Sequence, residues 1–307
     1  MSNEEDKYQP EEVKPHRGYL SSHWHGDHSL AKAYWINNWL LSIVIATVLV
    51  YWIFVSVDTL SPIYFSRTVL LILFISYFVI YPWQIIGLWR SSNRYIQEKN
   101  KTFWPRIVKF TVIIGLFGSI AGEIKDIEWY KVLVHDAFVL SKQHNYDVSI
   151  DDNIIILNGD LDYGISEQVE KLVNQNPGVV AIVLNSDGGL LYEASQLSKI
   201  ILLNSLNTYT NDGCSSACTI AYISGSERFI HEKSYLGFHK YSYIHPKLKL
   251  SDLDLFEDQN KDAAFFRKRG ASKEFTNKMY QAESEDMWYP SISELQNYGV
   301  VHKVIED

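Results

Sequence analysis

The sequence predicts an α/β domain that is preceded by an N-terminal transmembrane helical region. Two long apolar runs without a charged residue lie in the first third of the 307 residues. In the second half, short apolar runs alternate with helical patterns and turn residues, which is typical of a mostly parallel sheet covered by helices. We therefore expect a cytoplasmic tail over 1–37, a transmembrane region over 38–123 and a soluble domain over 124–307.

The sequence argues against a nucleic-acid-binding protein and against a cleavable signal peptide. The formal net charge is -8, and we expect no nucleic-acid partner, because such binders present a basic patch or stripe. A cleavable signal peptide is not expected, because the first 37 residues are polar and the first apolar run is too long. Aromatic residues make up 14% of the chain and are dense in the first third, as at a membrane interface.

Three segments predict membrane-spanning helices. The run WLLSIVIATVLVYWIFVSV covers 39–57, and TVLLILFISYFVIYPWQIIGLW covers 68–89. Neither carries a charge, and about 20 apolar residues span the hydrocarbon core. The third segment, 104–122, starts with Arg106 and Lys109, whose long side chains can reach the interface. Its uncharged part is short, so a buried or interfacial helix remains the alternative to the span that we favour.

The distribution of basic residues predicts the orientation. Between 58 and 67 the only basic residue is Arg67. The loop between the second and third segments instead carries Arg90, Arg94, Lys99, Lys101 and Arg106. Because basic loops stay in the cytoplasm, this loop and the N-terminus are expected inside. With three spans, the domain after Gly122 lies on the periplasmic or extracytoplasmic side of the cytoplasmic (inner) membrane; with two spans, it would lie inside.

The N-terminal tail contains the histidine-rich stretch HWHGDHSL, which begins at His23. Its candidate metal ligands are His23, His25, Asp27 and His28. Their spacing fits no metal template, so we favour a solvated or interfacial loop over a metal site. No metal and no cofactor are expected for the chain.

Apolar runs that end at turn residues predict the strands of the soluble half, and helical patterns lie between them. The expected strands are 153–159, 178–189 (which runs into a glycine-rich turn), 207–210, 227–232 and 235–241. The expected helices are 166–175, 191–206 and 218–225. Ser166 is the expected cap of the first helix. Two further amphipathic helices, which break at Gly270, are expected to turn Phe256, Ala263, Phe266 and Met279 toward the sheet or a partner.

Two turns lie where strands end and helices begin, and ligands gather there in such sheets. In NSDGG, 185–189, two adjacent glycines let a ligand approach the backbone closely. In GCSSAC, 213–218, Ser216 lies at the N-terminus of a helix, where free N–H groups can stabilise a developing anion. A serine hydroxyl becomes a nucleophile when a base removes its proton, and His239 is the candidate base.

The two cysteines of the chain, Cys214 and Cys218, flank Ser216. They are too few for a structural zinc site. We favour two unbonded thiols that pack as small apolar side chains around the turn. The alternative is a mutual disulfide, which requires an oxidising compartment.

From Asn153 to Val304 the sequence resembles the Clp protease proteolytic subunit and its relatives, within the crotonase-like fold. The resemblance is greatest to membrane-associated or periplasmic Clp-like proteins. Four motifs carry it in order: IILNGDLDYG, VLNSDGG, CSSACTIAYISGSERF and LGFHKY. They resemble the first strand and its turn, the oxyanion turn, the nucleophile turn with its helix, and the strand that delivers the catalytic histidine. Asp187 stands where the family's oxyanion turn usually has proline.

The resemblance implies Ser216 as nucleophile and His239 as base. It also implies that the N–H groups of Gly189 and Ala217 form the oxyanion hole. For the acid that orients the histidine we choose Asp286, with Glu285 and Glu283 as neighbouring alternatives. Lys240 follows His239 and points to the opposite face of the strand, which makes it the poorer base.

The function expected from these residues is a membrane-anchored serine endopeptidase that hydrolyses peptide bonds. Its expected partners are a peptide or protein substrate, the lipid bilayer and further copies of the chain in a homo-oligomer. No Walker-type glycine loop is present, so ATP-dependent unfolding would need a partner. The alternative is a catalytically inactive membrane scaffold or binding protein that keeps the fold.

Overall fold

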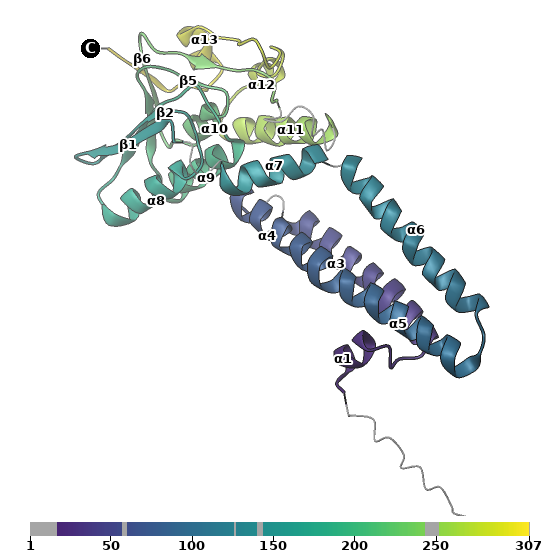
Figure 1. Cartoon of the computed structure of the whole chain (residues 1–307). Coiled ribbons are helices and arrows are strands. Elements are labelled where there is room, and N and C mark those ends of the chain that lie inside the picture. The colour runs from purple at the N-terminus through teal and green to yellow at the C-terminus, as the bar shows by residue number, and fades with distance from the viewer. Residues whose placement is uncertain (1–16, 57–59, 126, 140–143, 243–251, 307) are drawn as a thin grey trace, which may run out of the picture. The chain divides into compact units, whose positions relative to one another are not determined.

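The computed structural model describes residues 17–56, 60–125, 127–139, 144–242 and 252–306, with the backbone alone at 120–125 and 252–254. The chain divides into two compact units. The first comprises described residues of 1–60 and 68–127, and the second those of 61–67 and 128–307. Figure 1 labels many of the helices and strands of both units.

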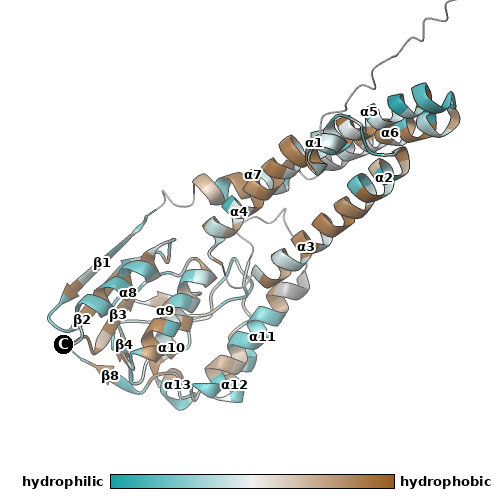
Figure 2. Cartoon of the chain, turned by 90° about the horizontal axis from the view of Figure 1, so that it is seen from below, coloured by the Kyte–Doolittle hydropathy of each residue, from teal (hydrophilic) through white to brown (hydrophobic). Residues whose placement is uncertain are grey.

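The N-terminal part of the chain is helical. Two of its helical runs, Leu30–Ser56 and Pro62–Lys99, are long and apolar enough to cross a membrane, and few of their side chains are buried. The third predicted segment forms α6, and Figure 2 shows the apolar character of α3. The elements are α1 (Tyr19–Trp24), α2 (Leu30–Tyr34), the π-helical η1 (Trp35–Leu40), α3 (Leu41–Ser56), α4 (Pro62–Ile75), the π-helical η2 (Ser76–Ile80), α5 (Tyr81–Lys99) and α6 (Phe103–Lys125).

The histidine-rich stretch is only partly the loop that we expected. Residues 25–29 form a loop with His25 and Asp27 exposed, whereas His23 belongs to α1 and is fully buried against α5. A Cβ atom on Gly87 would lie 2.3 Å from His23 Nε2, so only glycine leaves room for the ring. Asn37 Nδ2 lies 2.8 Å from His23 Nδ1. Asp27 pairs with Arg94 at 2.7 Å, which ties the next turn to the same helix. The described residues hold no group of three His, Cys, Asp or Glu placed for a metal ion.

The C-terminal part is an α/β domain around a six-stranded mixed sheet, whose strand order is β1-β2-β3-β4-β6-β8. Among the described strands of this sheet, only β1 and β2 pair antiparallel. The strands are β1 (Tyr146–Asp151), β2 (Ile154–Gly159), β3 (Ala181–Asn185), β4 (Asn207–Thr210), β6 (Arg228–His231) and β8 (Lys303–Ile305). A separate parallel pair joins β5 (Cys214–Ser215) to β7 (Leu236–Gly237).

Seven helices are described in this part: α7 (Ile127–Phe138), α8 (Ile165–Gln175), α9 (Leu191–Leu203), α10 (Cys218–Ile223), α11 (Asp252–Lys268), α12 (Lys273–Lys278) and α13 (Ile292–Asn297). Ile155, Ile182 and Leu184 are fully buried in the sheet. Such continuous apolar runs are expected of parallel strands, because both faces of the sheet are covered. The turn after β3 lies at the carboxyl edge of this sheet, and a bridge between Ser186 and Cys214 joins it to β5 of the separate pair.

The start of α8 corrects the expected cap. Ser166 lies inside the helix. The N-cap position is occupied by Gly164, which has no side chain that could cap the helix. The buried carboxylate of Glu193 on α9 instead accepts hydrogen bonds from the N–H groups of Gly164 and Ser166, each at 3.0 Å, and from the Ser166 hydroxyl. A carboxylate suits this position because helix N-termini carry free N–H groups and a partial positive charge.

The two amphipathic helices form on either side of Gly270, as predicted. They are α11 and α12, and Gly270 has a left-handed φ of 102°. Ala263, Phe266 and Met279 are buried in the domain core, whereas Phe256 is 61% exposed. The first three side chains therefore serve intramolecular packing.

Candidate active site

Ser216 has an unusual backbone conformation. Its φ is 54°, which non-glycine residues rarely adopt and which is often found at functional sites. The Ser216 N–H donates to the carbonyl of Gly237 at 2.8 Å, and the Thr219 hydroxyl donates to the Ser216 carbonyl at 2.7 Å. The chain thus turns sharply between β5 and α10, and the Ser216 side chain is left half-buried beside the next strand.

His239 meets the Ser216 side chain. The distance from His239 Nε2 to Ser216 Oγ is 2.6 Å, within hydrogen-bond range. His239 follows β7, and the adjacent Phe238 forms an antiparallel bridge with Trp288 that fixes this segment. Burial lowers the pKa of His239 below its ordinary value, and the Ser284 backbone partly opposes this effect. A neutral imidazole can accept the proton of the hydroxyl.

The three candidate acids do not reach the imidazole. The carboxylate of Asp286 is exposed and accepts a hydrogen bond from the N–H of Met287 at 2.8 Å. Glu283 pairs with Lys240 at 2.6 Å, and Glu285 is exposed. Among the described residues, the buried Nδ1 of His239 has no hydrogen-bond partner of good geometry. Lys240 is engaged by Glu283 and does not contact Ser216.

Two glycines shape the backbone opposite Ser216, and both have a left-handed φ. A Cβ atom on Gly188 would lie 2.8 Å from the Cβ of Ser216, so this glycine permits the close approach of the two turns. A Cβ on Gly189 would lie 2.7 Å from the carbonyl oxygen of Leu161. Within the described part of the chain, the N–H groups of Gly189 and Ala217 donate to no protein acceptor. Both are free to bind an oxyanion.

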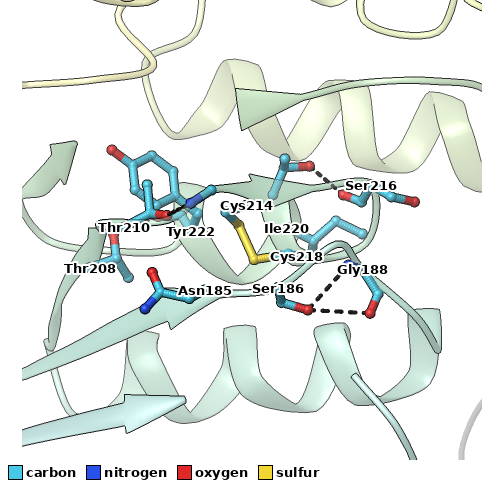
Figure 3. Close-up of a disulfide and its surroundings, with 12 residues drawn as sticks. Asn185, Ser186, Gly188, Thr208, Thr210, Cys214, Ser216, Cys218, Ile220 and Tyr222 are labelled. Atoms are coloured by element: carbon cyan, nitrogen blue, oxygen red, sulfur yellow. Dashed lines mark hydrogen bonds between the residues drawn. A yellow bond between two sulfur atoms is a disulfide. The ribbon is translucent and has the colours of Figure 1, made fainter. Parts of the chain in front are cut away.

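Sequence reasoning missed the part that Ser186 plays in this turn. Its hydroxyl is buried and accepts a hydrogen bond from the N–H of Gly188 at 3.1 Å (Figure 3). The carbonyl of Ser186 accepts from the N–H of Ser215 at 2.9 Å. Ser186 therefore links the glycine turn to the strand that precedes Ser216. A serine within a glycine-rich turn was the signal that could have indicated this.

The cysteines are joined, so the expectation of two unbonded thiols is wrong. Cys214 and Cys218 form a disulfide across the Ser216 turn, with their Cα atoms 5.4 Å apart (Figure 3). Both side chains are fully buried. The left-handed Ser216 reverses the chain between them and brings the two Cβ atoms together, as a disulfide requires.

A hollow of about 300 Å³ lies beside the glycine turn, at the carboxyl ends of β2, β3 and β4. The carboxylates of Asp160, Asp187 and Asp212 line it, and Tyr235 forms an aromatic wall. Asp187 raises the pKa of Tyr235, although burial is the larger cause. The negative charge of this hollow favours cationic groups over anionic ones.

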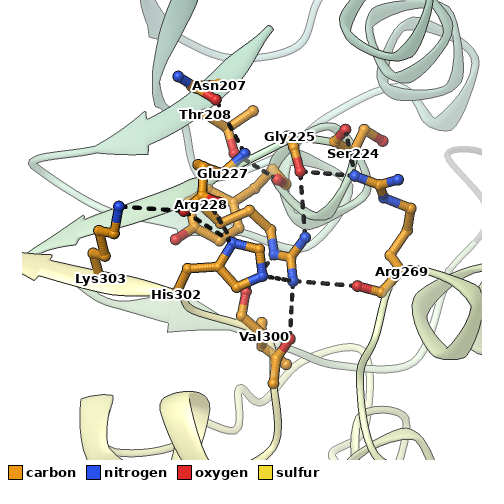
Figure 4. A network of polar contacts seen from close by, with 12 residues as sticks. Asn207, Thr208, Ser224, Gly225, Glu227, Arg228, Arg269, Val300, His302 and Lys303 are labelled. Carbon is orange, nitrogen blue, oxygen red and sulfur yellow. Dashed lines mark hydrogen bonds and ion pairs between the residues drawn. The ribbon is translucent and has the colours of Figure 1, made fainter. Parts of the chain in front are cut away.

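Two arginines hold the far end of α10, the helix that follows Ser216 (Figure 4). Arg269 donates to the carbonyls of Ile223, Ser224 and Gly225 at 2.8 to 3.2 Å. The buried Arg228 donates to the carbonyls of Gly225 at 3.3 Å and Val300 at 2.8 Å. Cations suit this position because the last carbonyls of a helix have no partner within the helix.

Comparison with known proteins shows no family for this chain. No protein-family model matches the sequence, and no curated protein matches it. Among solved structures, the chain is similar to ClpP1 from Listeria monocytogenes and to a single-substitution mutant of that protein. Both solved structures share 17% sequence identity with this chain, with a TM-score of 0.44. Each match covers 51% of this chain and 93% of the solved chain. The similarity is distant and assigns the chain to no family.

Proposed function

We propose that this protein is a membrane-anchored serine peptidase that uses Ser216 as nucleophile and His239 as base. The observation that carries the proposal is the 2.6 Å contact between His239 Nε2 and Ser216 Oγ. It occurs at a serine held in a left-handed turn, with two unpaired N–H groups nearby in the chain. Nucleophile, base and anion donors are the three components that acyl transfer requires.

In the proposed reaction, Ser216 Oγ attacks the carbonyl carbon of a peptide bond while His239 Nε2 takes the hydroxyl proton. The N–H groups of Gly189 and Ala217 stabilise the negative charge that forms on the carbonyl oxygen. His239 then gives its proton to the leaving amine, and an acyl-enzyme remains on Ser216. A water molecule, deprotonated by the same imidazole, releases the acid product.

His239 must carry its own proton on Nδ1 while Nε2 accepts from Ser216. Burial lowers the pKa of His239, and the Ser284 backbone partly opposes this effect. We propose that the Ser284 carbonyl orients the imidazole. Asp286, which we expected in this role, lies two residues further on and would have to turn away from Met287 to reach the ring.

The membrane placement is part of the proposal. Three spans within 38–123, with the 1–37 tail inside, would put the 124–307 domain on the extracytoplasmic side. Two helical runs are long and apolar enough to span a membrane, and the arrangement requires α6 as the third span. The basic loop before α6 and the Cys214–Cys218 disulfide support it, because basic loops stay in the cytoplasm and disulfides persist in oxidising compartments. A reporter enzyme that works only after export, fused after Gly122, tests it; a cytoplasmic signal would overturn the topology.

A fluorophosphonate probe tests the chemistry. The full-length protein in detergent is labelled, and the adduct is located by mass spectrometry. We expect labelling of the wild type and of Ser215→Ala, and none of Ser216→Ala. Ser215 is a matched control because it is the adjacent serine and its buried Oγ has no partner in the described part of the chain. Equal labelling of wild type and Ser216→Ala would refute the assignment.

One observation favours a second candidate, an inactive scaffold. The Nδ1 atom of His239 is buried without a hydrogen-bond partner among the described residues, as expected if the orienting group has been lost. A scaffold of this kind would keep the fold and bind partners at the membrane. Folded wild-type protein that takes up no probe at any pH would support it over the peptidase.

A further inference from the structure

A five-residue covalent ring encloses the proposed nucleophile. The disulfide joins Cys214 to Cys218, and Ser216 lies in the middle of the intervening segment. The ring also contains Ala217, whose N–H group is one of the two proposed oxyanion donors. The two groups that must be placed relative to His239 are therefore inside the ring that the disulfide closes.

The two ends of the ring belong to different structural elements. Cys214 lies in β5, and its N–H donates to the carbonyl of Tyr235 at 3.0 Å. Cys218 is the first residue of α10. The disulfide thus fixes the first residue of β5 to the first residue of α10, across the residue whose φ is 54°. Without this bond, Ser216 could relax toward negative φ, because a left-handed conformation is disfavoured for any residue with a Cβ.

We infer that the Cys214–Cys218 disulfide is a positioning element for Ser216, and that the hydrolase becomes competent only after this bond has formed. This inference rests on the proposed function. In the oxidation, the two thiols lose two protons and two electrons and one S–S bond forms. The electrons reduce the disulfide of a thiol oxidoreductase to two thiols, which take up the protons. Cytosolic thiols are kept reduced, so the chain would be inactive until its domain reaches an oxidising compartment.

A positioning role and a merely stabilising role give different results. A bond that only stabilises the fold would lower the unfolding temperature and leave the reactivity of the folded protein unchanged. A bond that positions Ser216 sets the rate of the chemical step, since a small displacement of a reacting atom can cost about 100-fold in rate. The chain has two cysteines in all, so a thiol reductant acts on this one bond.

The experiment compares the oxidised full-length protein, the reduced and alkylated protein, and the double variant Cys214→Ala/Cys218→Ala. Mass spectrometry confirms the thiol state, thermal unfolding confirms the fold, and fluorophosphonate labelling gives the rate. We expect reduction and the double variant each to slow labelling at least about tenfold, while unfolding stays cooperative. Removing the reductant before alkylation and reoxidising the protein should restore the rate. The double variant is the control for the reductant, which should not change its rate.

Two results would overturn the inference. Fully reduced, folded protein that labels at the oxidised rate would show that the bond does not position Ser216. Loss of cooperative unfolding in both the reduced protein and the double variant would show that the bond is needed for folding and not specifically for the nucleophile. If oxidised wild type does not label at all, the proposed function itself has failed. The two failures are therefore distinguishable.

Discussion

Replacing Gly188 by alanine should displace the nucleophile. A Cβ at this position would lie 2.8 Å from the Cβ of Ser216 and 3.0 Å from the carbonyl oxygen of Ser215. Carbon atoms in contact prefer about 3.5–4.0 Å, so the two turns must separate by roughly 0.7 Å or more. Such a shift moves Ser216 Oγ relative to His239 and distorts the 2.6 Å contact between them. We expect labelling by the fluorophosphonate to slow about 100-fold, the typical cost of misplacing a reacting group by about 1 Å.

Alanine at Gly188 also strains the backbone, because φ there is 113°. A residue with a Cβ in such a conformation costs about 1–3 kcal/mol. Gly164→Ala is the matched control: its φ is 92°, but the nearest atom to an added Cβ is the Tyr146 hydroxyl at 3.4 Å. Both variants should unfold at lower denaturant concentration, and only Gly188→Ala should lose reactivity.

The assay measures the labelling rate of each variant together with its unfolding free energy. Wild-type labelling by a folded Gly188→Ala would refute the contact argument, because the turns would then tolerate the extra carbon. An equal loss of labelling in Gly164→Ala would attribute the effect to destabilisation of the domain and not to the clash with Ser216.

Four further outcomes follow from the same geometry. Burial lowers the pKa of His239, so kcat/KM should rise with pH with a midpoint below 6.5, as a pH–rate profile would show. Burial and Arg228 also lower the pKa of His302. The neutral imidazole therefore stabilises the fold above pH 6.5, and this stabilisation is lost as the pH falls through the lowered pKa. His302→Gln should flatten part of the pH dependence of thermal unfolding. Glu193→Gln should cost about 2–3 kcal/mol in denaturant titration, because the amide keeps only one acceptor oxygen and turns its NH2 group toward at least one of the three buried donors. Asp286→Asn should change kcat less than about threefold if Ser284 orients His239; a loss of several orders of magnitude would restore the aspartate to that role.

The sequence predicted the parts of the fold that depend on local pattern. Continuous apolar runs marked β2 and β3, and the break at Gly270 separates α11 from α12. β1 was missed although Tyr146–Asp151 alternates apolar and polar residues, which is the pattern of a half-buried strand that pairs here with β2. The predicted strand 235–241 shrinks to Leu236–Gly237, since only those residues find a parallel partner in β5.

The sequence predicted the site residues whose side chains have a recognisable chemistry. It did not predict the features of the site that depend on the conformation of a loop. Ser216 and His239 meet, although their assigned roles stay a prediction. The surroundings of His239 Nδ1 depend on how the chain turns around Ser284 and Asp286, which no periodic pattern encodes. The disulfide was misjudged for a similar reason. Whether two cysteines four residues apart can bond depends on the backbone between them, and here the left-handed Ser216 decides.

The guanidinium groups of Arg228 and Arg269 leave α10 little freedom to slide along its own axis. The helix is secured at its first residue by sulfur and at its last carbonyls by these two side chains. If the domain is the proposed peptidase, a short helix that is fixed at both ends cannot adapt to different substrates, and substrate specificity must be set by the surrounding loops. Directed evolution that aims at new specificity should therefore diversify the segments after β2, β3 and β4 and leave α10 and its two arginines untouched.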